Sequence, residues 1–233
     1  WCWGRIMPPT SSMEITSGVG VTNEMGEFEI EFQAIPDRSL SADLKPQFNY
    51  QITADVVDIT GETHSSSTNA SVGYLALNAE VLLSGEVSKA DRNKFKISTT
   101  NLNGQDEPAK GTITIHQLRQ PEQVFRNRLW RQPDKFLMSE SEFHAKFPTD
   151  LYKDELDEKS WEKTKQVYSE SFDTEKEDSL DLKQCKNWQQ GRYVLELKAL
   201  DKFGSEIKSI LYFNLSGPDE SGIPTRENLW YSG

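Results

Sequence analysis

Apolar and polar residues alternate along several short runs of the chain. In the run 27–32, Phe28, Ile30 and Phe32 fall on one face and three glutamates fall on the other. Alternation with a period of two residues is typical of an antiparallel strand that has one solvated face. The same pattern recurs in six further runs, at residues 50–56, 75–83, 95–99, 113–115, 193–200 and 207–215. The pattern therefore predicts a mainly β protein.

Four turn signals separate these runs. Each begins with Asn or Asp and has Gly at its fourth position, at residues 23–26, 58–61, 101–104 and 201–204. The Asn or Asp side chain accepts hydrogen bonds from turn amides, and Gly supplies the positive φ angle that such turns need. Many short strands joined by hairpin turns, without alternating helices, favour a β-sandwich.

An internal recurrence suggests two related modules. Tyr50, Asp58 and Gly61 are matched 143 positions later by equivalent residues in the final part of the chain, Tyr193, Asp201 and Gly204. We therefore expect tandem immunoglobulin-like (macroglobulin-type) β-sandwich modules at residues 1–74 and 75–216, with 217–233 as a linker to a following domain. The first module is expected to be incomplete, because only about four strands fit where an immunoglobulin sandwich needs about seven.

Residues from about 121 to 184 lose the alternation and gain charge. Ser139 and Glu142 form the pattern of a capping box ahead of an apolar segment, and Pro148 would stop the helix. A second helix is predicted over residues 157–168, because Trp161, Lys165 and Tyr168 fall near one helical face. We expect a helical insertion whose aromatic residues pack onto the second sandwich.

Charge and hydropathy limit the classes of partner. The chain of 233 residues has a formal net charge of -11, which repels the phosphate backbone and argues against nucleic acid as a partner. It has no run of about 18 apolar residues that would span a membrane. We expect the sequence to be a fragment of a larger protein, cut at both ends, that makes no membrane contact itself.

Candidate catalytic and metal-binding residues are few. The three histidines, His64, His116 and His144, lie at no metal-ligand spacing, and the sequence contains no nucleophile elbow or phosphate loop. The spacing of Cys2 and Cys185 gives no zinc motif and leaves open whether the two cysteines form a disulfide. The sequence thus predicts no enzyme, with no catalytic, cofactor-binding or metal-binding residue and no cofactor.

The acids between residues 150 and 158 could hold calcium, but the glycine that a calcium loop needs is absent. A solvated helix face is the favoured interpretation. The sequence also has six tryptophans. Trp188 adjoins a strand and is expected in the core, whereas Trp130 and Trp161 lie in the insertion. Aromatic platforms bind sugars and peptides, so a carbohydrate- or peptide-binding β-sandwich module of a bacterial surface protein is the alternative function.

Four stretches of the chain resemble bacterial alpha-2-macroglobulin-like proteins. They are the strand entry at 26–28, the hairpin at 50–63, the insertion motifs at 129–134 and 142–148, and the strand and turn at 191–204. The resemblance implies macroglobulin domains of a large cell-envelope protein, located in the periplasm, anchored to the outer membrane or at the cell surface.

Members of that family trap or inhibit proteases, and some carry a thioester within the motif Cys-x-Glu-Gln. Neither Cys2 nor Cys185 is followed by that motif, so no reactive residue of the family carries over to this chain. The resemblance implies a structural and interaction module of a protease trap or endopeptidase inhibitor. Its partners would be adjacent domains of the same polypeptide and a protease.

Overall fold

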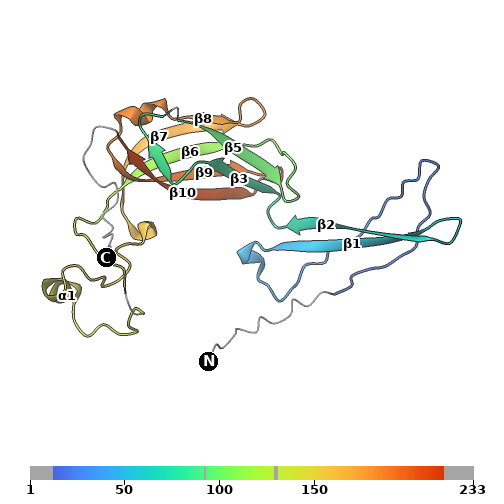
Figure 1. Cartoon of the computed structure of the whole chain (residues 1–233), viewed down its shortest axis with the longest axis horizontal. Helices are drawn as coiled ribbons and strands as arrows, with labels where there is room; N and C mark the ends of the chain where they lie inside the picture. Colours follow the sequence, from blue (N-terminus) through green and yellow to red (C-terminus); the bar gives the residue numbers. More distant parts are fainter. Residues whose placement is uncertain (1–12, 92, 129–130, 218–233) are drawn as a thin grey trace, which may run out of the picture. The chain divides into compact units, whose positions relative to one another are not determined.

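The protein is described by a computed structural model that covers residues 13–91, 93–128 and 131–217. The chain divides into two compact units, Trp1–Tyr74 and Leu75–Gly233, which are described separately below. Strands make up 43% of the chain and helices 9%, so the predicted mainly β fold class is confirmed (Figure 1).

The first unit contains one β-hairpin in its described residues. Strands β1 (Gln47–Val57) and β2 (Thr63–Gly73) pair antiparallel without a bulge, and a short 3₁₀ turn η1 (Ala42–Leu44) precedes them. Only Tyr50 of this unit is a buried large side chain among the described residues. The described part of residues 1–74 is thus a two-stranded sheet, where the sequence predicted about four strands of an incomplete sandwich.

The strand predicted at residues 27–32 is wrong, because the segment joins no sheet among the described residues. Phe28 and Ile30 are exposed, whereas Phe32 lies against the hairpin: the rings of Phe32 and Tyr50 are 5.6 Å apart, and the Tyr50 hydroxyl donates to the carbonyl of the nearby Ile35. Alternation provides an apolar face, but a strand also needs a neighbouring backbone with which to form a hydrogen-bonded ladder.

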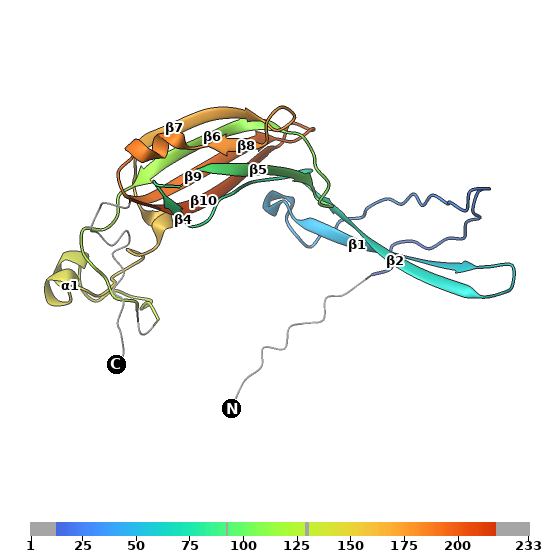
Figure 2. The ribbon, with the colours of Figure 1, turned by 45° about the horizontal axis from the view of Figure 1, so that its top comes forward.

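The second unit is a sandwich of two sheets (Figure 2). Its first sheet has the order β3-β5-β8 and its second the order β4-β10-β9-β6-β7. The first three strands along the chain are β3 (Leu77–Leu82), β4 (Glu86–Ser88) and β5 (Lys94–Asn101). They are followed by β6 (Lys110–Leu118), β7 (Lys163–Asp173), β8 (Ser179–Asp181), β9 (Gly191–Leu200) and β10 (Glu206–Ser216).

The strand order of the second unit is compatible with that of an immunoglobulin-type sandwich. In that comparison, β3, β5 and β8 would correspond to strands A, B and E, and β10, β9, β6 and β7 to strands G, F, C and C′. Near the start of β9, the Tyr193 hydroxyl donates to the Gln189 carbonyl at 2.6 Å, as the tyrosine of a tyrosine corner does. The tandem arrangement stays a prediction, since the described residues of the first unit form a two-stranded sheet.

The core fills the space between the two sheets with alternate strand residues. Strand β3 shows the pattern directly, with Leu77, Ala79 and Val81 buried and their neighbours exposed. Aromatic rings continue the core: Tyr193 stacks on Phe213 with centroids 5.5 Å apart, and Trp188 lies 5.5 Å from Tyr193. The core position predicted for Trp188 is confirmed.

One turn geometry recurs four times in the chain and confirms the four turn predictions. In each turn the first side chain accepts from the amides two and four positions later, and a glycine at the fourth position has φ between +79° and +85°. The turns begin at Asn23, Asp58, Asn101 and Asp201. The 143-residue recurrence thus reflects a common turn, and the two tyrosines bond to different backbone segments.

Asp201 does more than form its turn. Its Oδ2 accepts from the amide of Ala76 at 3.2 Å, which ties the start of β3 to the β9–β10 turn. Burial opposes ionisation of this carboxyl, but hydrogen bonds from the amides of Ser205, Ala76 and Phe203 together hold its pKa below the ordinary value. Asn101 makes the same turn with an amide, so the Ala76 contact is what requires a carboxylate in the later turn.

We expect Asp201→Asn to destabilise the protein by about 1–3 kcal/mol at pH 7. The side-chain NH₂ group of the asparagine would face the backbone N–H of Ala76, so that two donors meet where Oδ2 now accepts. A lowered pKa means that the folded state binds fewer protons, so this stability is present above the unfolded pKa of about 3.9 and is lost as the pH falls through the folded pKa. Urea unfolding from pH 7 to pH 3 should show the two proteins converging. A difference in the free energy of unfolding that stays constant with pH would contradict this role of Asp201. Asn101→Asp is the control.

The insertion is shorter and less helical than predicted. Residues 157–168 do not form a helix: a 3₁₀ turn η2 (Glu158–Ser160) leads into β7, and β8 follows before a 3₁₀ segment η3 (Lys183–Asn187). Strand β7 carries polar residues on both faces because it is an edge strand, so it lacks the alternation that marks the other strands. Pairing with β6 overrides the helical spacing.

The helix at the capping box is confirmed as α1 (Glu140–Lys146). The Ser139 side chain accepts from the Glu142 amide, and the Glu142 carboxylate accepts from the Ser139 amide. The aromatic residues of this segment pack on one another, with Phe143 5.3 Å from Phe147 and 5.4 Å from Tyr152. Residues 119–162 contribute no described side chain to the sandwich core, so the predicted packing of the insertion aromatics onto the sheet is wrong for this part, whereas Tyr168 and Phe172 in β7 do pack there.

Candidate functional site

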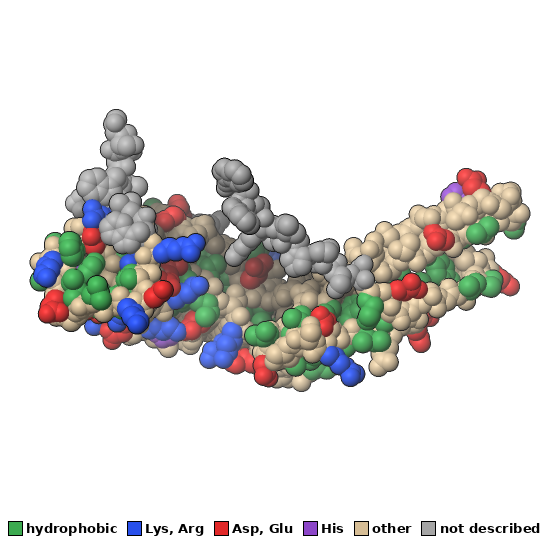
Figure 3. Space-filling view, turned by 90° about the horizontal axis from the view of Figure 1, so that it is seen from below, with side chains coloured by type: hydrophobic (Ala, Val, Ile, Leu, Met, Phe, Trp, Pro, Cys, Tyr) green, Lys and Arg blue, Asp and Glu red, His purple; other side chains and the backbone are tan. Residues whose placement is uncertain are grey.

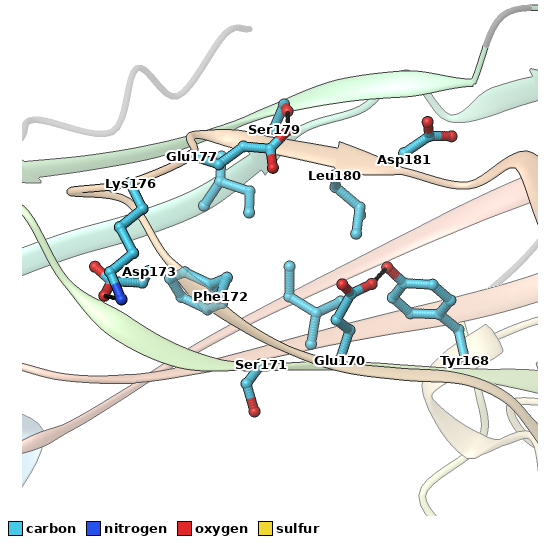
Figure 4. A pocket seen from close by; sticks show the side chains of 12 residues that line it. Tyr168, Glu170, Ser171, Phe172, Asp173, Lys176, Glu177, Ser179, Leu180 and Asp181 are labelled. Atoms are coloured by element: carbon cyan, nitrogen blue, oxygen red, sulfur yellow. Dashed lines mark hydrogen bonds and ion pairs between the residues drawn. The ribbon is translucent and has the colours of Figure 1, made fainter.

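A small cavity of about 200 Å³ opens between the edge strands β7 and β8 (Figure 4). Apolar side chains of the two sheets line its inner part, among them Ile97, Ile113, Phe172 and Leu180. Its rim carries four carboxylates and one ammonium group: Glu170, Asp173, Glu177, Asp181 and Lys176. The cavity lies where the two sheets end without a strand to close them, because β7 and β8 are both outermost in their sheets.

The polar groups at this rim are already bonded to one another. Asp173 pairs with Lys110 at 3.2 Å and with Lys176 at 3.7 Å. The Ser179 hydroxyl donates to Glu177, and Lys183 pairs with Asp181 at 2.7 Å. The rim is therefore a set of exposed ion pairs, which stabilise the strand ends modestly.

The pKa values of three groups in the cavity are shifted away from neutral pH. Hydrogen bonds from Ser179 and Lys183 hold the pKa values of Glu177 and Asp181 below their ordinary range, so both act only as acceptors. Burial and a hydrogen bond to Glu170 raise the pKa of Tyr168, so its hydroxyl stays protonated. Side chains that act as general acids or general bases need pKa values near the working pH.

The three histidines lie in separate environments. His64 is exposed in β2, His116 Nδ1 lies 3.7 Å from Glu196 in the five-stranded sheet, and His144 Nε2 lies 3.4 Å from Glu155 beside α1. The three histidines therefore lie on three different elements, β2, β6 and α1.

The acids predicted as a solvated helix face have structural partners instead. Asp150 pairs with Arg126, Glu158 pairs with Arg192 in β9, and Asp157 caps η2. The Glu155 carboxylate accepts from two backbone amides, those of Tyr152 and Lys153. The helix expected there does not form, and these carboxylates hold the irregular path of the chain from α1 to β7.

The tryptophans give no aromatic platform among the described residues. Trp188 is core, and the half-buried Trp161 donates its indole N–H to the Glu155 carbonyl at 2.7 Å. Trp130 and the terminal tryptophans lie outside the described residues. Sugar-binding platforms present an exposed ring face. The hydrogen bond of Trp161 lies within the insertion, and Trp161 is not part of the sandwich core onto which it was expected to pack.

Cys185 is a buried free thiol. It is fully enclosed in the core, and the Asn93 side chain donates to its sulfur at 2.7 Å. Burial raises the pKa of this thiol above its ordinary value, although Asn93 and Lys186 lower it in part. Cys2 lies outside the described residues, so the question of a disulfide with it is not decided by the fold.

We expect Cys185 to react slowly in the native protein, because the thiolate is the reactive form and burial disfavours it. In a Cys2→Ser variant, Cys185 is the remaining thiol, and iodoacetamide labelling can be followed by mass. Labelling in 6 M guanidinium should be complete within the time in which the native protein stays about 90% unmodified. Equal rates in the two states would contradict a buried structural role.

The described residues contain no helix that is long and apolar enough to cross a membrane. No protein-family model matches the chain, and no curated protein matches it either.

Proposed function

We propose that this chain is a structural and interaction module of a large alpha-2-macroglobulin-like protein of the bacterial cell envelope, where it positions other domains of a protease trap. The observation that carries the proposal is the two-sheet sandwich of the second unit, with a strand order compatible with an immunoglobulin domain and a hydrogen bond from Tyr193 to Gln189 that resembles a tyrosine corner. Such sandwiches serve as rigid units in multidomain extracellular proteins. The family, the extracytoplasmic location and the protease as a partner are proposed from the resemblance of four sequence stretches to alpha-2-macroglobulin-like proteins.

The first unit supports a role in which the hairpin packs against an adjacent domain of the same polypeptide. A two-stranded hairpin is marginally stable in water and gains stability from a further packing surface. Several of its apolar side chains remain at the surface, with Val56 41%, Val57 63% and Val72 40% exposed. Hydrophobic side chains are visible at the surface on the right of Figure 3. An adjacent domain of the same polypeptide that covers this hairpin would convert the chain into a positioned part of a larger assembly.

The site geometry supports a module without catalysis of its own. The polar groups of the cavity are engaged with one another, and the buried thiol is held in its neutral form. The alternative function, binding of carbohydrate or peptide through the insertion tryptophans, has no specific observation in its favour, because the Trp161 indole is used internally.

Amide hydrogen exchange on the isolated chain and on the longer polypeptide that carries it tests the proposal. Amides of β1 and β2 should exchange at least about tenfold more slowly in the longer polypeptide, while β9 should be protected in both and serves as the internal control. Equal exchange of the hairpin in the two proteins would contradict a packing role for neighbouring domains. Cleavage of the longer polypeptide by a protease should then change the exchange rates of the β1 and β2 amides. Unchanged exchange rates would contradict the proposal that the longer protein is a protease trap.

The alternative has a separate readout. If the chain binds glycans, soluble polysaccharides should quench its tryptophan fluorescence saturably, and Trp161→Phe should abolish the quenching. The scaffold role predicts no saturable quenching. A saturable response would replace the proposed function with the alternative.

A further inference from the structure

Three side chains with metal-ligand chemistry converge beside α1. Glu140 and His144 are four positions apart on α1 and therefore share one face of the helix. The chain returns after the helix and places Glu155 against the same face, so that one donor atom from each residue lies within 4.8 Å of the other two. The sequence spacing shows the first pair, but the position of Glu155 depends on the fold of residues 147–155.

The surrounding structure holds two of these groups in place. The Glu155 carboxylate accepts hydrogen bonds from the Tyr152 amide at 3.1 Å and the Lys153 amide at 2.8 Å. The His144 ring is packed among aromatic side chains, with Phe125 at 5.6 Å and Tyr152 at 6.3 Å between ring centroids. Ligands whose orientation is fixed before binding lose little conformational entropy when an ion arrives.

The polar contact of the imidazole lies within the cluster. His144 Nε2 lies 3.4 Å from Glu155 Oε1, while the buried Nδ1 has no hydrogen-bond partner among the described residues. Two ligands at about 2.0–2.1 Å from a tetrahedral ion are about 3.4 Å apart. The separation of the nitrogen and the oxygen is thus that of two corners of a zinc coordination sphere.

We propose that Glu140, His144 and Glu155 form a binding site for a divalent transition ion of the zinc class. One imidazole and two carboxylates are ligands that zinc accepts, and the nitrogen disfavours calcium and magnesium, which prefer oxygen ligands. Three protein ligands leave a fourth position for water. The ion would link α1 to the following loop and so fix the fold of a segment that contributes nothing to the sandwich core.

Lys153 competes with the ion in this site. Its ammonium group lies 3.9 Å from Glu140 Oε2, and 57% of its side chain is exposed, so it can move into solvent when a cation binds. A second cluster, formed by Asp58, Glu62 and His64, is exposed in all three residues, and Asp58 Oδ1 already accepts from the Thr60 and Glu62 amides of its turn. That second cluster provides the control residue.

The test measures Zn²⁺ binding to the full chain by isothermal titration calorimetry, with the bound metal counted by mass spectrometry after gel filtration. We expect one Zn²⁺ per chain. Glu140→Gln, which changes an exposed side chain and leaves the aromatic packing intact, should weaken binding at least about tenfold, and His144→Gln should do the same. His64→Gln should leave both the affinity and the stoichiometry unchanged. Circular dichroism of each variant shows that it is folded.

A gain in affinity gives a second, independent readout. Lys153→Met removes the competing ammonium group but keeps the backbone amide that orients Glu155, so it should tighten Zn²⁺ binding several-fold. The proposal is overturned if the wild-type chain retains no Zn²⁺, or if His64→Gln removes the ion while His144→Gln does not. It is also overturned if Co²⁺ bound in place of Zn²⁺ gives the visible spectrum of a six-coordinate ion surrounded by water.

Discussion

Gly111→Ala should destabilise the second unit by about 3 kcal/mol, because β6 has no room for a methyl group at this position. A Cβ built on Gly111 would lie 2.1 Å from the Lys198 carbonyl oxygen in β9 and 2.7 Å from a ring carbon of Phe172 in β7. The ring can rotate away, but the carbonyl belongs to the ladder between β6 and β9, where Gly111 pairs with Ala199. Relief of the clash would separate the two strands.

Urea unfolding at constant pH measures this effect as a shift in the transition midpoint. Gly85→Ala is the matched control, because no atom lies within 4 Å of the added Cβ there, and its effect should stay within about 0.5 kcal/mol. Phe172→Ala in the Gly111→Ala background should restore only a small part of the stability. Full restoration would show that the ring, and not the backbone carbonyl, excludes the side chain.

Phe213→Ala should reduce the free energy of unfolding by about 3–5 kcal/mol. Phe213 is completely buried in β10, and its ring stacks on Tyr193 with an angle of 18° between the planes. Truncation removes the buried surface of the ring and leaves a cavity beside the tyrosine corner, which the rigid sheets cannot close. The Tyr193 hydroxyl would keep its bond to Gln189, so the effect reports core packing alone.

Phe203 provides the control of the same residue type. It lies in the β9–β10 turn with 77% of its surface exposed, so Phe203→Ala should change the stability by no more than about 0.5 kcal/mol. Phe213→Leu keeps most of the volume and should fall between the two. If the two alanine variants were equally stable in urea, Phe213 would not be part of the core.

Local patterns in the sequence determine the core strands and the turns. Strands β3, β5, β6, β9 and β10 follow the runs of alternating residues, because one face of each strand is buried between the sheets, although β9 and β10 each also bury three residues in succession. The turns at Asn101 and Asp201 form from contacts within five residues. The helix α1 is likewise defined locally, by the reciprocal bonds of Ser139 and Glu142.

Only the tertiary structure decided the features that depend on a partner distant in the sequence. Residues 27–32 alternate but pair with no strand in the part of the chain that the structure describes, whereas β7 forms at the sheet edge because it pairs with the backbone of β6. The contact of Asp201 with Ala76 and the meeting of Glu155 with His144 also join separate segments. Alternation and spacing describe the faces of an element, but they carry no information on which other element will lie against that face.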